Sequence, residues 1–401
     1  MSALAGIRVL DFGRYVAGPY CATLLGDFGA DVIRVERCEG GEDRWLVPVS
    51  DDGDGALFLQ MSRNKRSLAY DPKACGSAEI IRRLVASADV VVVNVPPSAL
   101  AKMGLDYESL AAIKPDIILA NLSSFGATGP WKDRPGFDSV GQAMSGSQYL
   151  SGPGDVPYRS PITWVDHATA VYAAFAVMVA LFERQNSGRG QEIDGSLLGS
   201  ALAFSTTFLI EQALTGLNRT AIGNRSFLNG PTDTFATQDG FIVTQVVGDP
   251  IFRRWTELMD EPALLDDPRY ATDELRGENG TELSESMARW AAGRTSEQAL
   301  TQLADARIPA GPVLSPQQAL DHEQVQAMGL IQPTKVPRMG VTAPLTRPPV
   351  NLSATPAEIR SPAPAVGEHS VEVLSEIGYG ADEIAALEQA GAIASAKGTR
   401  P

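Results

Sequence analysis

A single carboxylate, Asp166, stands at the beginning of a long apolar stretch that runs from Trp164 to Asp194 and reads WVDHATAVYAAFAVMVALFERQNSGRGQEID. An aspartate in the first turn of a helix can cap it, because its side chain accepts hydrogen bonds from free backbone N–H groups and its charge suits the helix dipole. The capping-box pattern is incomplete, since Thr169 stands where a Glu or Gln would complete it. The same carboxylate could instead be a reactive group, and both roles are open at this point.

The apolar run from Ala168 to Phe182 predicts a helix in the protein core. The run is shorter than the roughly 17 residues that a helix needs to cross a bilayer, so we expect no membrane span. Charged residues end it, and a Gly-Arg-Gly turn at 188–190 leads into the next element. Asp166 is therefore expected where a polar loop meets the interior, a place that keeps a carboxylate away from water.

Basic residues gather near predicted strand ends in the N-terminal part of the chain. They are Arg34, Arg37, Arg63, Lys65, Arg66 and Lys102. Open α/β sheets bind ligands at strand ends, so these cations predict a site for a small anionic ligand, although solvated surface cations would give the same pattern. The formal charge of −15 over 401 residues argues against nucleic acid or an anionic membrane as a partner.

The elements that would position these residues alternate between strand and helix. Near-continuous Val, Ile and Leu runs indicate strands buried on both faces, which are typical of a mostly parallel sheet flanked by helices. The expected fold class is therefore α/β, with a Rossmann-like large domain. The expected strands are 7–12, 31–35, 67–70, 88–95 and 116–123, and the expected helices are 21–28, 78–86 and 107–113.

The motifs of several other enzyme classes are missing. The first strand-to-helix turn, 13–19, reads GRYVAGP instead of G-x-G-x-x-G, and neither a P-loop nor a G-x-S-x-G sequence occurs, so we expect no NAD. The three histidines, His167, His322 and His369, form no ligand pattern, so we expect no metal. Three widely spaced cysteines and the lack of a secretory signal at Met1 to Ala5 indicate a cytoplasmic protein.

The pattern of elements changes from about Thr234. The segment DTFATQDGFIVTQVVGD predicts two strands joined at Asp239-Gly240, and helices are expected at 252–259, 282–292 and 297–306. We therefore expect a large domain in residues 1–224, a smaller α+β domain in 225–330 and a C-terminal segment, 331–401, that returns to the large domain. In that segment a Pro-rich stretch, 333–349, is expected to cross back, and a helix is expected near 370–390.

A series of short segments resembles the class III CoA-transferases, the family that also contains carnitine CoA-transferase, formyl-CoA transferase and the α-methylacyl-CoA racemases. The segments are VLDFGRYVAGPY, LLGDFGADVIRVE, NKRSLAYD, VVNVPPSALAKMGLDYESL, SSFGATGPWKDRPGFDSVGQAMSG, the Asp166 helix with GRGQEIDGSL after it, IPAGPV, NLSATP and GEHSVEVLSEIGY. Their order and spacing are specific and cover nearly the whole chain. The resemblance implies an interlocked homodimer that binds coenzyme A as acyl-CoA and transfers it to a small carboxylic acid.

The resemblance further implies that Asp166 is the nucleophile. A carboxylate with an ordinary pKa near 3.9 is ionised at neutral pH, so it would need no partner base. Attack on an acyl-CoA thioester would give an aspartyl anhydride and CoA thiolate, and the thiolate would then form an aspartyl-CoA thioester that the incoming carboxylate attacks. Both intermediates hydrolyse readily, so we expect a pocket that excludes water and offers backbone N–H groups to the oxyanion.

Binding residues also follow from the resemblance, which implies CoA contacts by Val16, Ala17, Arg37, Arg63, Lys65, Arg66, Asn94 and Lys102. The acceptor acid is less well specified. Formyl-transferring relatives carry a glycine run where this chain has NRSFLNG at 224–230, which argues against formate or oxalate. Arg225 is a candidate to pair with the second carboxylate of a dicarboxylic acid such as succinate. Phe137, Gln142 and Tyr149 are candidates for the acyl pocket wall, and each could equally belong to the core.

Two other functions remain open. A racemase needs an acid and a base on opposite faces of the α-carbon, and its relatives in this family place a histidine in a Gly-His-Asp motif where this chain has Gly136-Phe137-Asp138. His167 directly follows Asp166, and successive helical side chains point in different directions, so we expect a buried or capping role for it. The other alternative is a non-catalytic CoA-binding protein, which acyl-CoA turnover would exclude.

Overall fold

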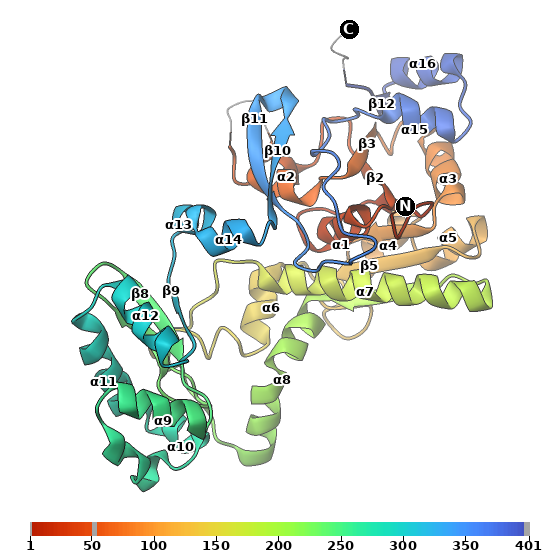
Figure 1. The fold of residues 1–401 in the computed structure, drawn as a ribbon. Helices are drawn as coiled ribbons and strands as arrows, with labels where there is room; N and C mark the ends of the chain where they lie inside the picture. The colour runs from red at the N-terminus through yellow and green to blue at the C-terminus, as the bar shows by residue number, and fades with distance from the viewer. Residues whose placement is uncertain (1, 50–53, 397–401) are drawn as a thin grey trace. The chain divides into compact units, whose positions relative to one another are not determined.

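The chain forms two compact units in a computed structural model that describes residues 2–49 and 54–396. The large unit comprises Met1–Ser145, Ser160–Ile210 and Gln326–Pro401, and the small unit comprises Gly146–Arg159 and Glu211–Val325 (Figure 1). The expected division at 224/225 therefore differs from the structure, which also assigns 146–159 to the small unit. One reason is local pairing, because the N–H of Gly223 donates to the carbonyl of Gly152 at 2.8 Å.

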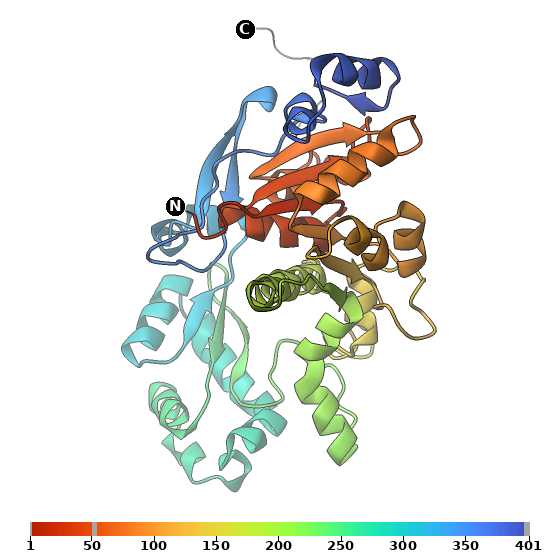
Figure 2. The ribbon, with the colours of Figure 1, turned by 90° about the vertical axis from the view of Figure 1, so that its right-hand side faces the viewer.

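A sheet of seven strands forms the centre of the large unit, in the order β12-β3-β2-β1-β4-β5-β6 (Figure 1, Figure 2). All neighbours are parallel except β12, which pairs antiparallel with β3. This confirms the α/β fold class and the mostly parallel sheet. The strands are β1 Arg8–Asp11, β2 Asp31–Glu36, β3 Lys65–Tyr70, β4 Val90–Val93, β5 Ile118–Ser123, β6 Glu192–Ser196 and β12 Ile393–Ala394.

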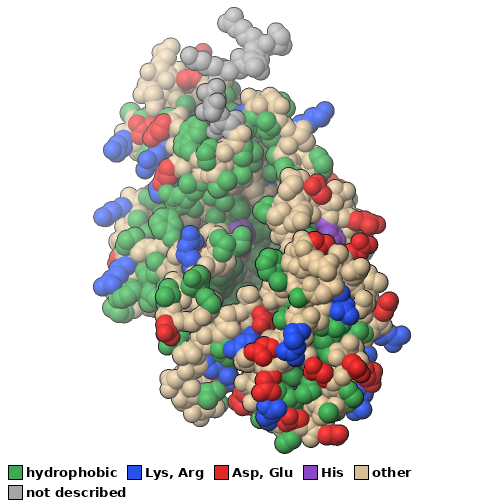
Figure 3. Space-filling model, turned by 90° about the vertical axis from the view of Figure 1, so that its left-hand side faces the viewer, with side chains coloured by type: hydrophobic (Ala, Val, Ile, Leu, Met, Phe, Trp, Pro, Cys, Tyr) green, Lys and Arg blue, Asp and Glu red, His purple; other side chains and the backbone are tan. Residues whose placement is uncertain are grey.

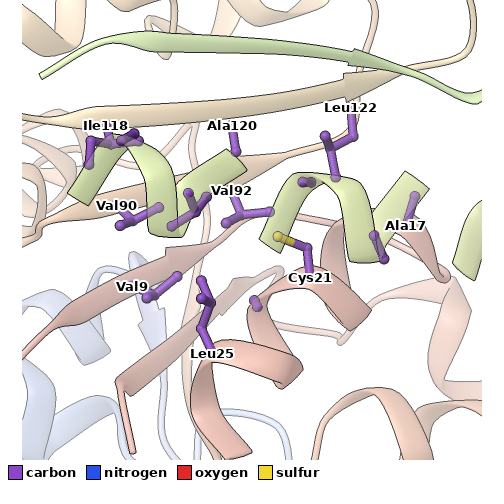
Figure 4. Packing of buried hydrophobic residues seen from close by; sticks show 14 of the residues in the cluster. Val9, Ala17, Cys21, Leu25, Val90, Val92, Ile118, Ala120 and Leu122 are labelled. Carbon is purple, nitrogen blue, oxygen red and sulfur yellow. The ribbon is translucent and has the colours of Figure 1, made fainter. Parts of the chain in front are cut away.

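Helices cover both faces of this sheet, which explains why its central strands are apolar throughout. On one face β1, β4 and β5 pack with α1 and α7, and Figure 4 shows Val9, Val92 and Cys21 meeting there. The other face is covered by α3, α5, α15 and α16. The helices of this unit are α1 Ala17–Asp27, α2 Ala56–Met61, α3 Ser77–Ser87, α4 Pro97–Met103, α5 Tyr107–Ile113, α6 Asp138–Met144, α7 Trp164–Ser187, α15 Ser370–Glu376 and α16 Ala381–Gln389, while α8 Leu197–Thr215 continues into the small unit.

Only one side of α7 is buried in the sheet core, so the expectation of a core helix is only half right. Large apolar side chains on its other side are exposed, with Phe175 and Phe182 at 67% and 70%. By length and composition both α7 and α8 could cross a membrane, in contrast to the expectation from the shorter apolar run. In the most apolar 18-residue stretch of each helix, 39% of α7 and 17% of α8 is buried, so much apolar surface is left uncovered on both helices.

The small unit contains a three-stranded sheet and its own apolar core. Strand β7 (Thr232–Ala236) pairs antiparallel with β8 (Phe241–Gln245) across the Asp239-Gly240 turn, which confirms the predicted hairpin, and β9 (Ala310–Pro312) pairs with β8. Phe252 and Trp255 are fully buried against this sheet. The helices are α9 Asp249–Leu258, α10 Asp273–Glu278, α11 Gly280–Ala292, α12 Ser296–Asp305 and α13 Pro316–Asp321, and α14 Glu323–Ala327 follows at the boundary.

The C-terminal segment adds to the large unit in a way the sequence only partly predicted. The Pro-rich stretch forms an antiparallel hairpin, β10 (Ile331–Val336) with β11 (Val341–Thr346), instead of a plain crossing segment. The expected single helix is split into α15 and α16, because Gly378 has a positive φ of 89° between them. An ion pair and a hydrogen bond attach the segment to the N-terminal part, since Arg338 pairs with Asp54, and Arg44 donates to the carbonyl of Pro364 at 3.1 Å.

Candidate active site

A cavity of about 310 Å³ lies at the carboxyl ends of β1, β4 and β5 within the large unit. Parallel α/β sheets bind their ligands at this edge. The cavity is lined by the turn after β1 (14–17), the segment after β4 (94–96), the end of β5 (122–124), the loop before α6 (135–137), Asp166 and Leu197. The structure thereby brings Asp166 together with Val16, Ala17, Asn94 and Phe137.

Asp166 lies in the first turn of α7 but does not cap that helix. The N-cap residue is Thr163, without a side-chain hydrogen bond, and among residues 2–49 and 54–396 no hydrogen-bond partner of the Asp166 carboxylate is recorded. Burial, together with the negative charge of Asp138, raises the pKa of Asp166 to about 7. The expectation of an ordinary, fully ionised carboxylate is therefore wrong, because the group lies in a poorly solvated place beside another acid.

The helix is capped by a residue from a different element, Asp138 at the start of α6. Its Oδ2 accepts hydrogen bonds from the N–H groups of Val165 at 2.8 Å and of Asp166 at 3.1 Å. These are two of the N–H groups that a helix leaves free at its start. Asp138 is the last residue of the Gly-Phe-Asp motif, but the sequence-based prediction used only Phe137, its central residue.

Phe137 faces the cavity beside an aromatic residue that the sequence analysis missed. The Phe137 side chain is 59% exposed, and its ring meets the ring of Tyr15 edge-on with 5.4 Å between centroids. Tyr15 has a φ of +64°, an uncommon conformation for a residue with a side chain. The aromatic pair forms part of the wall, and the phenyl ring of Phe137 cannot act as the missing histidine base.

His167 does not line the cavity. This agrees with the expected buried or capping role. Its Nδ1 lies 2.7 Å from the carbonyl oxygen of Thr163, the N-cap residue of the same helix. The imidazole ring packs edge-on against Tyr20 of α1, with 5.1 Å between centroids. The ring is therefore occupied in holding α7 against α1.

The turn after β1 is fixed by Asn94, which follows β4. Its Nδ2 donates to the carbonyl of Arg14 at 2.7 Å, and its Oδ1 accepts from the N–H of Arg14 at 2.8 Å. Helix α1 begins directly after this turn without a side-chain cap, so its first N–H groups have no side-chain partner. Backbone donors of this kind favour developing negative charge.

Two of the predicted CoA-binding cations, Arg37 and Lys102, are exposed and do not line the cavity. Burial alone would raise the pKa of Glu42, but hydrogen bonds and the charges of Arg14 and Arg37 lower it, so both arginines lie close to this carboxylate. Lys132, a second cation that the sequence analysis missed, acts on the same carboxylate as Lys102, that of Asp133. Hydrogen bonds from Ser98 lower the pKa of Asp133, and the charges of Lys132 and Lys102 contribute.

The other three predicted cations are engaged by carboxylates. Arg63 pairs with Asp27 at 2.6 Å and Lys65 with Asp11 at 2.7 Å, and all four side chains are fully buried. Arg66 is bound by several acids, of which Asp31 is 2.7 Å away. These pairings argue against phosphate binding by Arg63 and Lys65, because a phosphate would have to replace a carboxylate inside the core.

The remaining predicted pocket residues lie elsewhere. Gln142 is 1% exposed, does not line the cavity and hydrogen-bonds to Asp138, so its predicted place in the pocket wall is not supported by this structure. Tyr149 is exposed and belongs to the small unit. Arg225 also belongs to that unit, where its guanidinium donates to Thr281 at 2.6 Å and lines a separate cavity of about 320 Å³.

A metal site is not evident in the part of the chain that the structure describes. Among those residues no three or more His, Cys, Asp or Glu side chains are grouped so as to hold a metal ion. The chemistry that the cavity itself offers is that of one weakly solvated carboxylate, backbone N–H groups and an aromatic wall. This set suits acyl transfer through a covalent intermediate.

Comparison with known proteins gives a consistent result. The sequence model of CoA-transferase family III matches residues 4–370. The chain is 35% identical to succinate–glutarate CoA-transferase of Agrobacterium fabrum, over 93% of this chain and 95% of that protein. It is 34% identical to succinyl-CoA–D-citramalate CoA-transferase of Chloroflexus aurantiacus, over 96% of each. A crystal structure of a CAIB/BAIF family protein from Brucella suis superposes with a TM-score of 0.82 at 31% identity, covering 94% of this chain and 99% of that one.

These matches span both units and include the strand-end loops that form the cavity. They agree with the order of motifs along the sequence and with the observed sheet. The protein belongs to CoA-transferase family III and is a CoA-transferase.

Proposed function

We propose that this protein transfers CoA from succinyl-CoA to a second dicarboxylic acid, with Asp166 as the covalent nucleophile. The carboxylate attacks the thioester carbonyl, forming an aspartyl-succinyl anhydride and releasing CoA thiolate. The thiolate attacks the aspartyl carbonyl, which gives an aspartyl-CoA thioester and succinate. The acceptor carboxylate then displaces the thiolate, and the thiolate finally attacks the acceptor's acyl carbon, so that acyl-CoA leaves and Asp166 is regenerated.

The observation that carries this proposal is the state of the Asp166 carboxylate. It lines the cavity without a recorded partner among the described residues, and its pKa is about 7. A poorly solvated carboxylate is a stronger nucleophile than one in water, since little hydration is lost when it attacks. The apolar wall of Tyr15 and Phe137 would keep water from the anhydride and the thioester.

The proposed place of CoA follows from the strand-end turns. We assign the reacting end of the pantetheine arm to the cavity beside Val16 and Ala17, where the first N–H groups of α1 would stabilise the oxyanion. Arg37 and Lys102, with Lys132 near the latter, would bind the phosphates. Exposed Lys and Arg side chains bind phosphate groups through charge-assisted hydrogen bonds.

A dicarboxylic acceptor is proposed because relatives are named for succinate, glutarate and citramalate. The far carboxylate of such an acid requires a cation. Arg225, the sequence-based candidate, donates a hydrogen bond to Thr281 and lines the cavity in the small unit. Arg14 lines the Asp166 cavity and is the second candidate. Substituting each arginine by Lys and comparing KM for succinate with KM for a monocarboxylic acid would identify which one reads the second carboxylate.

A cytoplasmic homodimer is part of the proposal. The uncovered apolar sides of α7 and α8 include Phe175, Phe204 and Leu214 at 67%, 62% and 82% exposure. Hydrophobic side chains also reach the surface on the face that Figure 3 shows. Large exposed apolar areas are rare on monomers and mark interfaces. Phe175→Glu should lower the mass measured by analytical ultracentrifugation, whereas an unchanged dimer would exclude α7 from the interface.

The covalent step can be tested by mass spectrometry. The enzyme is mixed with succinyl-CoA, quenched with hydroxylamine or borohydride and digested. We expect a hydroxamate or a reduced side chain on the peptide that carries Asp166, and none in Asp166→Asn. Turnover without any change at Asp166 would disprove the nucleophile assignment while leaving the family membership intact.

A further inference from the structure

We propose that Asp138 is the positioning residue of the nucleophile: it holds the first turn of α7 at the cavity, and Gln142 in turn holds Asp138. The inference rests on the proposed role of Asp166 and adds two residues to that site. Neither residue is expected to touch the substrate. Both act through the backbone from which the Asp166 side chain projects.

The link from Asp138 to the nucleophile is direct. One oxygen, Oδ2, accepts from the N–H of Val165 at 2.8 Å and from the N–H of Asp166 itself at 3.1 Å. Helix α7 has no side-chain cap of its own, so this carboxylate satisfies N–H groups that would otherwise lack a partner in the first turn. A movement of Asp138 therefore moves the Cα of Asp166.

Gln142, one helical turn after Asp138, fixes the second oxygen of that carboxylate. Its Nε2 donates to Oδ1 of Asp138 at 2.5 Å, and its Oε1 accepts from the N–H of Ser160 at 2.9 Å. Asp138 and Gln142 are 3% and 1% exposed. The Gln142 amide thus connects the capping carboxylate to the chain that leads into α7. Its orientation is fixed because the NH₂ group must donate to Asp138 and the oxygen must accept from Ser160.

The close approach of the two helices is made possible by Gly141. A Cβ at this position would lie 2.9 Å from Cγ1 of Val165, a separation that real side chains do not adopt. A glycine at this turn of α6 therefore allows Asp138 to reach the N–H groups of α7. Packing and hydrogen bonding at this crossing support the same arrangement.

The Asp138 charge also acts on the nucleophile. After burial, it is the second cause of the raised pKa of Asp166. The titratable side chains that line the cavity with Asp166 are Arg14 and Tyr15. His167, the next residue on α7, does not line it, and its Nδ1 is directed to the Thr163 carbonyl. The ion-pair partner of Arg14 is Glu42. Removing the Asp138 charge should therefore move the ionisation of Asp166 to lower pH.

The test compares three variants by the rate at which succinyl-CoA modifies Asp166 in a quenched single turnover, followed from pH 5 to 9. Asp138→Asn keeps an acceptor for the α7 N–H groups, but its new NH₂ group meets the NH₂ group of Gln142. We expect the rate to fall by about 10- to 100-fold, as small misplacements of reacting groups do, with the pH midpoint moved below that of the wild type. KM for succinyl-CoA should change little.

The double variant Asp138→Asn with Gln142→Glu restores the donor–acceptor match between these two side chains and places the negative charge one helical turn further along α6. It loses the weaker hydrogen bonds from Gln142 Nε2 to the Ser160 and Ile162 carbonyls, both 3.4 Å away, so we expect it to recover part of the lost rate while the pH midpoint stays low. Gln142→Leu removes the amide but retains the Asp138 charge. It should lower the rate and leave the midpoint where it is in the wild type, and it supplies a second test if Asp138→Asn folds poorly.

A wild-type rate in Asp138→Asn, or a double variant no faster than Asp138→Asn alone, would overturn the inference. An unshifted pH midpoint in Asp138→Asn would overturn its electrostatic part. The proposed function is judged separately in the same experiment, because its failure would appear as an unmodified Asp166 in the wild-type enzyme.

Discussion

Replacing Asp166, the proposed nucleophile, should make this enzyme more stable, by an amount that depends on pH. In the folded protein the pKa of Asp166 is about 7, whereas its ordinary value is 3.8. The folded state therefore holds the proton more strongly than the unfolded state, so ionisation of Asp166 opposes folding. The contribution of Asp166 to the free energy of unfolding of the wild type is fully present below pH 3.8. It is lost as the pH rises, and the loss levels off above pH 7.

Asp166→Asn does not titrate, so its advantage over the wild type should grow across the same range. Each factor of ten in proton affinity is worth about 1.4 kcal/mol, which gives about 1.6 kcal/mol at pH 5 and at most about 4 kcal/mol at pH 8. Other mutations at active sites exchange activity for stability in the same way. The gain comes from burial, the largest cause of the raised pKa.

The assay is urea unfolding of wild type and Asp166→Asn at pH 5 and pH 8, at one protein concentration. Asp155→Asn, in an exposed loop, is the matched control and should differ from wild type by only a few tenths of a kcal/mol at both pH values. Equal stability of Asp166→Asn and wild type at pH 8, or an advantage that is the same at pH 5, would refute the reasoning.

Three further results are expected. Arg37→Ala should weaken binding of succinyl-CoA more than that of a succinyl-pantetheine thioester, because only CoA carries the nucleotide phosphates; equal losses in competition assays would argue against its phosphate role. Lys65→Met should lower the free energy of unfolding by about 3–5 kcal/mol, since it leaves the buried Asp11 carboxylate without its cation. Unchanged urea midpoints would contradict that structural role. In deuterated water the wild-type enzyme should introduce no deuterium at the α-carbon of 2-methylacyl-CoA, because Phe137 stands in the cavity where a base would be needed, and exchange seen by NMR would favour racemisation.

Five of the seven strands in the large sheet, β1 to β5, could be predicted because burial leaves continuous apolar runs in the chain, whereas β6 and β12 carry no such run and were missed. Val90 to Val93 form an uninterrupted apolar run, and β4 consists of these four residues. The Asp239-Gly240 turn was equally clear, since its residues suit a tight hairpin. These features depend on neighbours along the chain, and the sequence contains that information.

The partners of charged groups could not be predicted in the same way. Lys65 and its partner Asp11 are 54 residues apart, and Asp138 is 28 residues from Asp166. Such pairings depend on how strands and helices cross, and no local pattern records them. The raised pKa of Asp166 was missed partly for this reason, because burial is its largest cause and the second cause, Asp138, lies on another helix.

The way the C-terminal segment completes the large unit has a consequence for synthesis on the ribosome. Strand β12 (Ile393–Ala394) forms the edge of the sheet beside β3, and Arg338 and the Pro364 carbonyl complete the buried charges of Asp54 and Arg44. Strand β12, Arg338 and Pro364 are synthesised after the small unit, although β3, Arg44 and Asp54, which they join, are synthesised before it. The edge of the nascent N-terminal sheet therefore stays open, and some of its charges stay incompletely paired, until residues 338–394 have been synthesised. Nascent chains in this condition aggregate readily and depend on chaperones, so yields of recombinant enzyme should respond to slower translation or to added chaperone.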